Sequence, residues 1–154
     1  MRVATFASIA VLALAALPIA AREPGSSVPV LSSMPLCPLQ RVSSVEGRDG
    51  REPVANAREI AMGTASYERA LREMSEAGAA KGANAVVLTA HNASFYTRGN
   101  VPSPRPVYIV LNGVAVRLAD PGHCTVRVQD PEELQKRAVR GRGAPVPMEG
   151  TATN

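Results

Sequence analysis

The sequence predicts a small α+β domain, a sheet of three or four strands with one main helix packed on a face, in the order β-α-β-β. Two observations lead to this prediction. Apolar residues recur every three or four positions through residues 56–81, as they do in an amphipathic helix. Two runs rich in β-branched residues follow, at 84–91 and 107–118, as expected of strands. A weaker strand-like run at 38–46 comes before the helix.

The first 21 residues have the organisation of a secretory signal peptide. Arg2 precedes an apolar run that extends to Leu17, followed by Pro18 and by small residues at Ala20 and Ala21. The alternative, a membrane-spanning helix, needs roughly 20 apolar residues, and this run has about 15. We therefore expect cleavage near Ala21, a periplasmic or secreted protein, and no membrane anchor after cleavage.

The rest of the chain has room for one domain. Residues 22–37 are rich in Pro, Ser and Gly, which predicts a flexible leader. Residues 38–128 form the predicted α+β domain, in which residues 125–128 add a short edge strand. Residues 129–154 are predicted to contain a short helix that begins near Pro131, followed by a disordered basic tail from Arg140.

The net charge is too small to indicate a nucleic-acid partner. The whole chain has a formal charge of +4, and loss of Arg2 with the signal peptide lowers it to +3. Basic residues cluster only near the end of the chain, without the interleaved aromatic residues of a nucleic-acid-binding surface. We interpret this cluster as a solvated tail.

The helix is predicted to start at Asn56, because Glu59 follows it at the spacing of a capping box. Gly82 favours a left-handed stop at the other end. Gly63 weakens the first turns, so the main helix is alternatively expected near 64–81. The face predicted to pack on the sheet consists of Ile60, Thr64, Tyr67, Leu71, Met74 and Gly78.

The strand at 84–91 is apolar on both alternating faces, which predicts a central strand covered on two sides. The segment 92–106 contains Gly and several Pro residues and is expected to be an exposed loop. The run at 107–118 allows either a hairpin with a turn at Asn112 and Gly113 or one long bent strand with a bulge at Gly113.

Two segments of the chain resemble known families. Gly82-Ala83-Asn84-Ala85-Val86-Val87 joins the predicted helix to a strand, and Gly113-Val114-Ala115-Val116-Arg117-Leu118 ends the later strand. These segments, within residues 38–120, resemble the RcsF and YbjQ families. The resemblance implies one bent strand at 107–118. It also implies a role either in sensing envelope stress, as for RcsF-type proteins, or in the heavy-metal binding for which YbjQ-type proteins are named.

The chain has two cysteines, Cys37 and Cys124. Export to an oxidising compartment favours a disulfide between them. One alternative is a metal site in which the two thiolates are joined by His91 and His123, since borderline metals accept such ligands. The other is that the two thiols are free or pair with another chain. No cofactor is implied by any other motif.

His91 at the end of the predicted central strand is a candidate catalytic residue, but nothing in the sequence places a nucleophile or an acid beside it. We therefore expect no enzymatic activity. Asn92-Ala93-Ser94 matches the acceptor pattern for N-glycosylation, which applies only if the protein comes from a eukaryote.

Phe95, Tyr96 and Arg98 are the candidate partner-binding residues, because aromatic residues beside Arg on a loop are typical binding anchors. The alternative is that this loop folds back onto the domain. The function predicted from the sequence is that of an exported, non-enzymatic envelope protein that binds a protein partner or senses stress, with a metal-binding module as the alternative.

Overall fold

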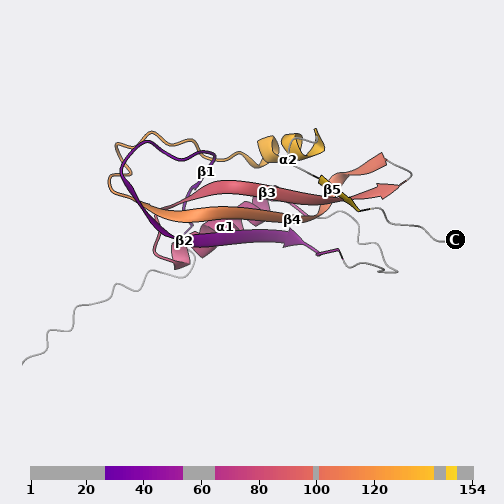
Figure 1. Cartoon of the computed structure of the whole chain (residues 1–154), viewed down its shortest axis with the longest axis horizontal. Helices are drawn as coiled ribbons and strands as arrows, with labels where there is room; N and C mark the ends of the chain where they lie inside the picture. The colour runs from indigo at the N-terminus through magenta and orange to yellow at the C-terminus, as the bar shows by residue number, and fades with distance from the viewer. Residues whose placement is uncertain (1–26, 54–64, 99–100, 141–144, 149–154) are drawn as a thin grey trace, which may run out of the picture.

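The computed structural model describes residues 27–53, 65–98, 101–140 and 145–148. The predicted α+β class is confirmed, with one mixed sheet and a main helix on one of its faces (Figure 1). The elements in chain order are β1 (Val30–Leu31), β2 (Leu39–Gly50), α1 (Tyr67–Ala80), β3 (Ala85–Arg98), β4 (Val101–Leu118), α2 (Pro131–Val139) and β5 (Pro145–Met148).

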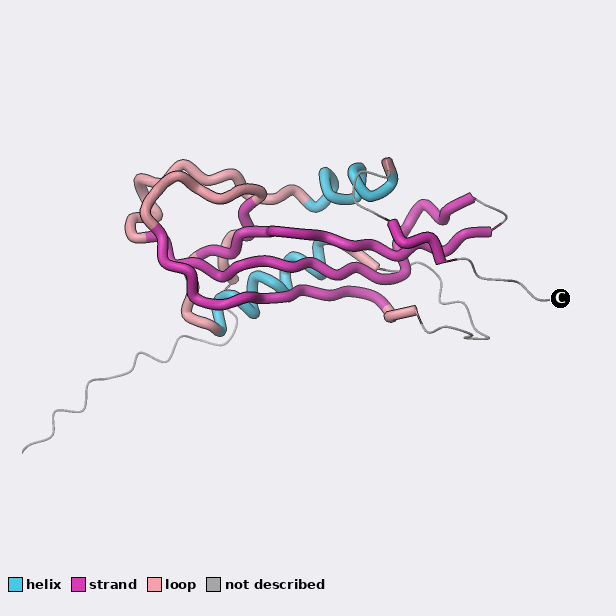
Figure 2. The backbone as a smooth tube through the Cα atoms, in the orientation of Figure 1, coloured by secondary structure: helices cyan, strands magenta, loops and turns pink. Residues whose placement is uncertain are grey.

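The sheet has the strand order β1-β3-β4-β2, and β5 also pairs with β3. The three long strands, β2, β3 and β4, run side by side as an antiparallel set (Figure 2). The short strands β1 and β5 both lie parallel to β3. The predicted central strand is confirmed, because β3 has β4 on one side and the two short strands on the other.

Helix α1 packs its predicted apolar face on the sheet. Tyr67, Leu71, Met74 and Gly78 are all buried, which confirms the part of the stripe that falls on described residues. The helix approaches β2 so closely that a Cβ atom at Gly47 would overlap the backbone oxygen of Ala70. Glycine at this position therefore sets the spacing between helix and sheet.

The N-terminus of α1 is capped from the sheet. The backbone N–H of Ser66 donates to Asp49 Oδ2 at 2.6 Å, and Arg69 donates to both carboxylate oxygens at 2.9 and 2.8 Å. Burial of Asp49 acts to raise its pKa, but the hydrogen bonds from Arg69 and Ser66 prevail and lower it. The predicted cap at Asn56 lies outside the described residues. At the other end Gly82 has a φ of 75°, so the predicted left-handed stop is confirmed.

The two faces of the sheet have separate cores. The larger core lies between the sheet and the two helices and includes Ile109, Leu111 and Leu134. The smaller core lies on the opposite face, where Val87 and Val116 are buried together with other residues near the start of β3 and the end of β4. The start of β3 is therefore covered on both sides, as predicted, whereas Ala90 and Asn92 further along the strand are exposed.

The prediction of an exposed loop at 92–106 was wrong. Strand β3 continues to Arg98, and β4 begins at Val101 and pairs with it, with Phe95 opposite Pro106. The register shifts on both sides of Phe95, so bulges absorb the irregular pairing. The run at 107–118 belongs to one long strand, as the resemblance implied, and Gly113 pairs with Val45 on one side and Leu88 on the other.

The described part of the predicted flexible leader, residues 27–37, is also ordered. Val30 and Leu31 pair with Val86 and Val87, and Leu31 is completely buried. Ordering this segment costs conformational entropy, which its Pro and Ser residues cannot offset because they bury little apolar surface. Burial of Val30 and Leu31 at the edge of β3 supplies the missing stabilisation.

Further towards the N-terminus, Val28 is held by α1. Its backbone N–H donates to Ser75 Oγ at 2.8 Å, and the same hydroxyl donates to the Val28 carbonyl oxygen at 2.5 Å. A single buried serine of the helix thus satisfies both polar groups of this residue.

The C-terminal region agrees with the prediction in part. The expected edge strand at 125–128 forms a single antiparallel bridge, from Val128 to Leu31. Helix α2 begins at Pro131 as predicted, and the Asp130 side chain accepts the N–H of Glu132. The prediction of disorder from Arg140 was wrong for residues 145–148, because they pair with β3 as β5.

Candidate protein-interaction surface

The predicted disulfide is present and joins two loops. Cys37 and Cys124 are bonded, with 5.8 Å between their Cα atoms. Cys37 lies just before β2, and Cys124 lies between β4 and α2. We call residues 32–38 and 119–129 the disulfide-linked loops. The cross-link indicates a compartment that is not reducing.

The disulfide-linked loops are also fixed by hydrogen bonds and packing. The Ser32 N–H donates to the Arg127 carbonyl oxygen at 2.9 Å, and the Gln129 N–H donates to the Val30 carbonyl oxygen at 2.8 Å. Both cysteines pack against the smaller core. The loops are therefore attached to the sheet at more than one point, so a binding partner would meet a surface that is already ordered.

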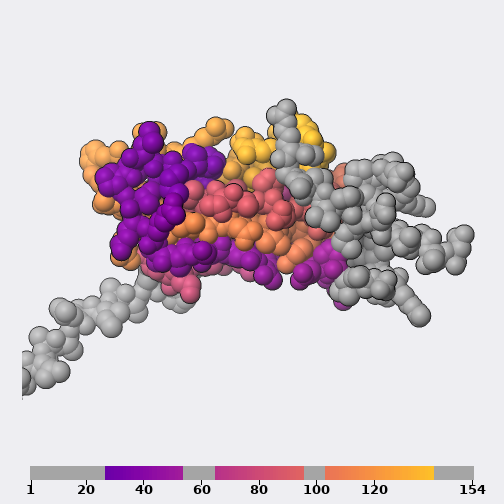
Figure 3. Space-filling model, viewed as in Figure 1, coloured from indigo at the N-terminus to yellow at the C-terminus, as the bar shows by residue number. Residues whose placement is uncertain are grey.

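Large apolar side chains concentrate on these loops. Six large apolar residues are exposed in the described part of the chain, and four of them belong to the disulfide-linked loops. Leu36 is fully exposed at 105%, Val128 is 58% exposed, Met34 41% and Val126 37%. Figure 3 shows the two loops, one indigo and one orange, lying against each other at one end of the molecule.

The structure does not place the predicted binding residues on a free loop. Phe95 is only 3% exposed and belongs to the larger core. Tyr96 and Arg98 belong to β3, and their side chains lie outside the described part of the structure. For Phe95, the alternative that the segment folds back onto the domain is correct.

Sequence reasoning missed the disulfide-linked loops as an apolar surface. The signal was the segment Met34-Pro35-Leu36 immediately before Cys37. Apolar residues beside a half-cystine are held in place by the cross-link, whereas the surrounding Pro and Ser residues suggested a flexible segment.

His91, the candidate catalytic residue, lies beneath the two helices. Its Nδ1 atom is 3.3 Å from the Tyr67 hydroxyl, and the two rings meet edge to face with centroids 5.9 Å apart. Burial lowers the pKa of His91, and the nearby positive charge of Arg137 lowers it further. Burial also raises the pKa of Tyr67 to about 12. Both side chains are thus held neutral at physiological pH, and the contact links β3 to α1.

The residues of the alternative metal site are not brought together. The two cysteine sulfurs are bonded to each other, His91 contacts Tyr67, and His123 pairs with Asp120 at the surface with 2.8 Å between Nδ1 and Oδ2. Within the described ranges, no three His, Cys, Asp or Glu side chains are grouped as metal ligands. Thiolate binding to a metal would first require reduction of the disulfide.

Asn92, the candidate glycosylation site, lies within β3 and its side chain is exposed. It faces away from α1, because the neighbouring positions His91 and Ala93 belong to the face that carries the helix.

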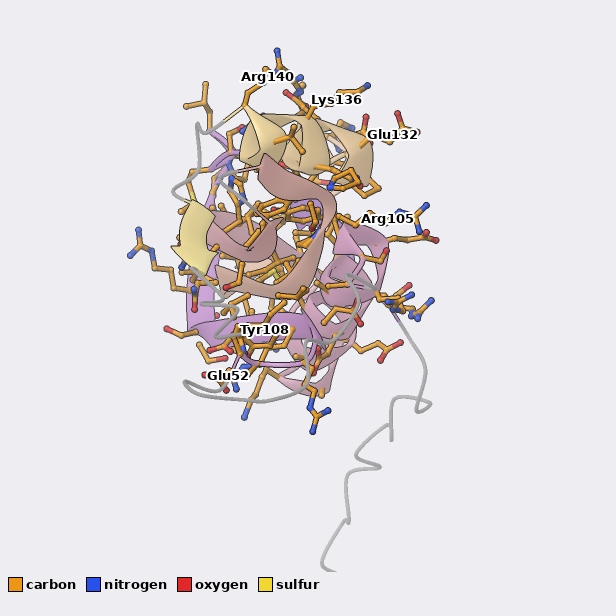
Figure 4. The ribbon with its side chains drawn as sticks, turned by 90° about the vertical axis from the view of Figure 1, so that its right-hand side faces the viewer. Glu52, Arg105, Tyr108, Glu132, Lys136 and Arg140 are labelled. Carbon is orange, nitrogen blue, oxygen red and sulfur yellow. A yellow bond between two sulfur atoms is a disulfide. The ribbon has the colours of Figure 1, made fainter. Side chains whose placement is uncertain are left out.

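Two surface hollows lie near α2. The larger, of about 530 Å³, is lined by residues of α2 and the one that follows it, namely Glu132, Gln135, Lys136, Val139 and Arg140. Figure 4 shows Glu132, Lys136 and Arg140 along the outer surface of α2, pointing away from the sheet. Two residues of the predicted basic cluster form ion pairs within α2. Arg137 pairs with Glu133 at 2.7 Å, and Lys136 pairs with Glu132 at 3.5 Å, so acidic side chains balance part of the positive charge.

The smaller hollow, of about 260 Å³, lies where α1, β4 and α2 meet. Ala65, Ser66, Arg69, Arg105 and Gln135 line it. Arg69 pairs with Asp49, and the same carboxylate accepts the Ser66 N–H. The helix N-terminus at this hollow therefore already contacts a carboxylate of the chain itself.

Comparison of the chain with family models, with curated proteins and with solved structures gives no match. The resemblance to the RcsF and YbjQ families therefore stays a prediction from the sequence. Neither helix in the described part of the chain is long and apolar enough to cross a bilayer.

Proposed function

We propose that this chain is an exported, non-enzymatic protein of the periplasm or the extracellular space that binds a protein partner through the disulfide-linked loops. The observation that supports this proposal most directly is the full exposure of Leu36 one residue before a half-cystine. Burying a leucine side chain is worth about 1.5–3 kcal/mol, so a partner that covers Leu36 gains binding energy at one position.

The neighbouring residues extend the same surface. Met34 lies on the same loop, and Val126 and Val128 lie on the loop across the disulfide. Apolar side chains held on an ordered scaffold lose little conformational entropy on binding, which favours association. The stress-sensing role implied by the resemblance would use this partner contact, and it is part of the proposal.

A photo-crosslinking amino acid tests the surface directly. We would place it at position 36 in the full chain and, as a matched control, at position 139, because Val139 is also apolar and is 60% exposed. The expected result is a discrete cross-linked protein from position 36 that is absent from position 139. The double substitution Met34→Ser and Leu36→Ser should abolish capture of that protein by the purified chain.

Equal cross-linking from both positions would refute the proposal, because it would show adhesion without a defined surface. Capture of the partner by the Met34→Ser, Leu36→Ser variant at the level of the unsubstituted protein would refute it as well. Circular dichroism of the variant checks that the substitutions leave the fold unchanged.

A further inference from the structure

The segment 125–129 runs beside β1 at one edge of the sheet and is joined to it by a single antiparallel bridge. Two hydrogen bonds join it to β1 and the residue that follows, from the Ser32 N–H to the Arg127 oxygen and from the Gln129 N–H to the Val30 oxygen. They flank the bridge between Leu31 and Val128. Figure 1 shows this segment, just before α2, along the upper border of the molecule with β1 beneath it.

The hydrogen-bond pattern fixes the direction of the remaining backbone groups. In an extended strand, the N–H and C=O groups of one residue point to one side, and those of the next residue point to the other. The Arg127 C=O and the Gln129 N–H both point to β1, so Val128 between them directs its N–H and C=O outwards. The same alternation, continued along the extended segment, directs the N–H and C=O of Val126 outwards as well. Within the described ranges, no hydrogen bond satisfies these four groups.

The side chains of this edge suit a further strand. Val126 and Val128 are β-branched and exposed, and residues 125–129 contain no proline. Natural proteins usually protect a free edge with proline, charge or a covering element, and the one such feature in residues 125–129 is the exposed charge of Arg127. The opposite edge of this sheet has such protection, because Glu73 of α1 accepts the outward N–H of Arg48 on β2 at 2.7 Å.

We infer that an extended segment of the partner protein adds to the sheet along residues 125–129 by main-chain hydrogen bonds. This inference rests on the proposed function and specifies its binding mode. Arg127 lies between the two valines and is 74% exposed, with 3.5 Å between its guanidinium and Glu133. The segment that fits best has an acidic residue with one β-branched residue on each side of it, so that a carboxylate lies opposite Arg127.

A second copy of the chain is a poorer occupant of this edge. In an antiparallel pair that joins Val126 of one chain to Val128 of the other, the two copies of Arg127 lie directly opposite each other. Like charges at directly opposed positions destabilise strand pairing. The charge of the edge therefore favours a different chain with an acidic centre.

Defined peptides test this inference. The probe is a fluorescein-labelled peptide, Lys-Thr-Val-Glu-Val-Thr-Lys, and its control is Lys-Thr-Pro-Glu-Pro-Thr-Lys, which lacks the two N–H groups. On the full oxidised chain, the first peptide should bind and slow amide exchange at Val126 and Val128 by about tenfold or more. The proline peptide should leave both rates unchanged.

Two variants separate backbone from side-chain effects. Val128→Pro removes the outward N–H and leaves the bonds of Arg127 and Gln129 in place, so peptide affinity should fall by about tenfold. Val128→Thr keeps the N–H and a similar shape, and affinity should stay within about threefold. The amide-exchange measurement uses the unsubstituted protein, so the test holds even if the proline variant does not fold.

Equal binding of the proline peptide, unchanged exchange at the two valines, or no binding of either peptide would overturn the inference. So would protection of both amides without peptide as protein concentration rises, because a second copy would then occupy the edge. Cross-linking from position 36 is independent of these outcomes. If it succeeds while the peptides fail, the proposed function stands and only the strand-addition mode is refuted.

Discussion

Loss of the Cys37–Cys124 cross-link is expected to lower the free energy of unfolding by about 4.6 kcal/mol. The two cysteines are 87 positions apart, and closing a loop of that length removes conformational entropy from the unfolded chain. The value follows from the chain-entropy relation at 25 °C. For a domain of this size, it corresponds to a fall of about 15–20 °C in the melting temperature.

The assay compares the oxidised protein with the variant in which both cysteines are replaced by Ser, using urea unfolding followed by circular dichroism. Added dithiothreitol should destabilise the former and leave the latter unchanged. Both proteins should retain the same secondary structure, because the larger core does not include the cysteines. A difference below about 1 kcal/mol between the two proteins would refute the reasoning and show that the unfolded chain is constrained by other means.

Three further predictions concern the core. Phe95→Ala should lower the free energy of unfolding by about 3–5 kcal/mol, because Phe95 is buried; a loss below 0.5 kcal/mol would place it on the surface. Leu71→Ala, on the buried face of α1, and Val87→Ala, in the smaller core, should each lower the free energy of unfolding by about 2–4 kcal/mol, and exposed Arg72→Ala by under about 0.5 kcal/mol. A loss at Arg72 equal to that at Leu71 in urea titrations would contradict the assigned helix face. Burial lowers the pKa of His91 in the folded protein below its ordinary value of 6.5. The neutral imidazole therefore contributes stability at pH values above 6.5, and this stability is lost as the pH falls through the lower pKa of the folded state. Unfolding midpoints between pH 7.5 and 5 should fall more in the unsubstituted protein than in His91→Asn, and parallel curves would exclude this contribution.

Local patterns were sufficient for the main helix, the central strand and the disulfide. The spacing of Tyr67, Leu71 and Met74 marks a buried helix face wherever the helix starts, because the helical period itself brings these residues together. The apolar run that begins at Ala85 marks a strand covered on both sides. The presence of two cysteines in a chain with a predicted export signal was enough to predict their pairing.

The sequence did not reveal where β3 ends or which surface is free. Pro102 and Pro104 indicated a loop, yet β4 begins at Val101, because pairing with β3 and burial of Phe95 outweigh the poor strand propensity of proline. The candidate binding residue Phe95 therefore lies in the core instead of on the surface.

The candidate interaction surface depends on contacts between segments far apart in the chain. Leu36 and Val128 look like ordinary apolar residues in the sequence, and their exposure follows from how the disulfide and β1 hold the two loops. The periodic elements and the cross-link could be predicted from the amino-acid order, because they depend on neighbouring residues and on residue type. Which apolar side chains and backbone groups remain uncovered follows only from the fold, because it depends on which distant segment lies against each of them.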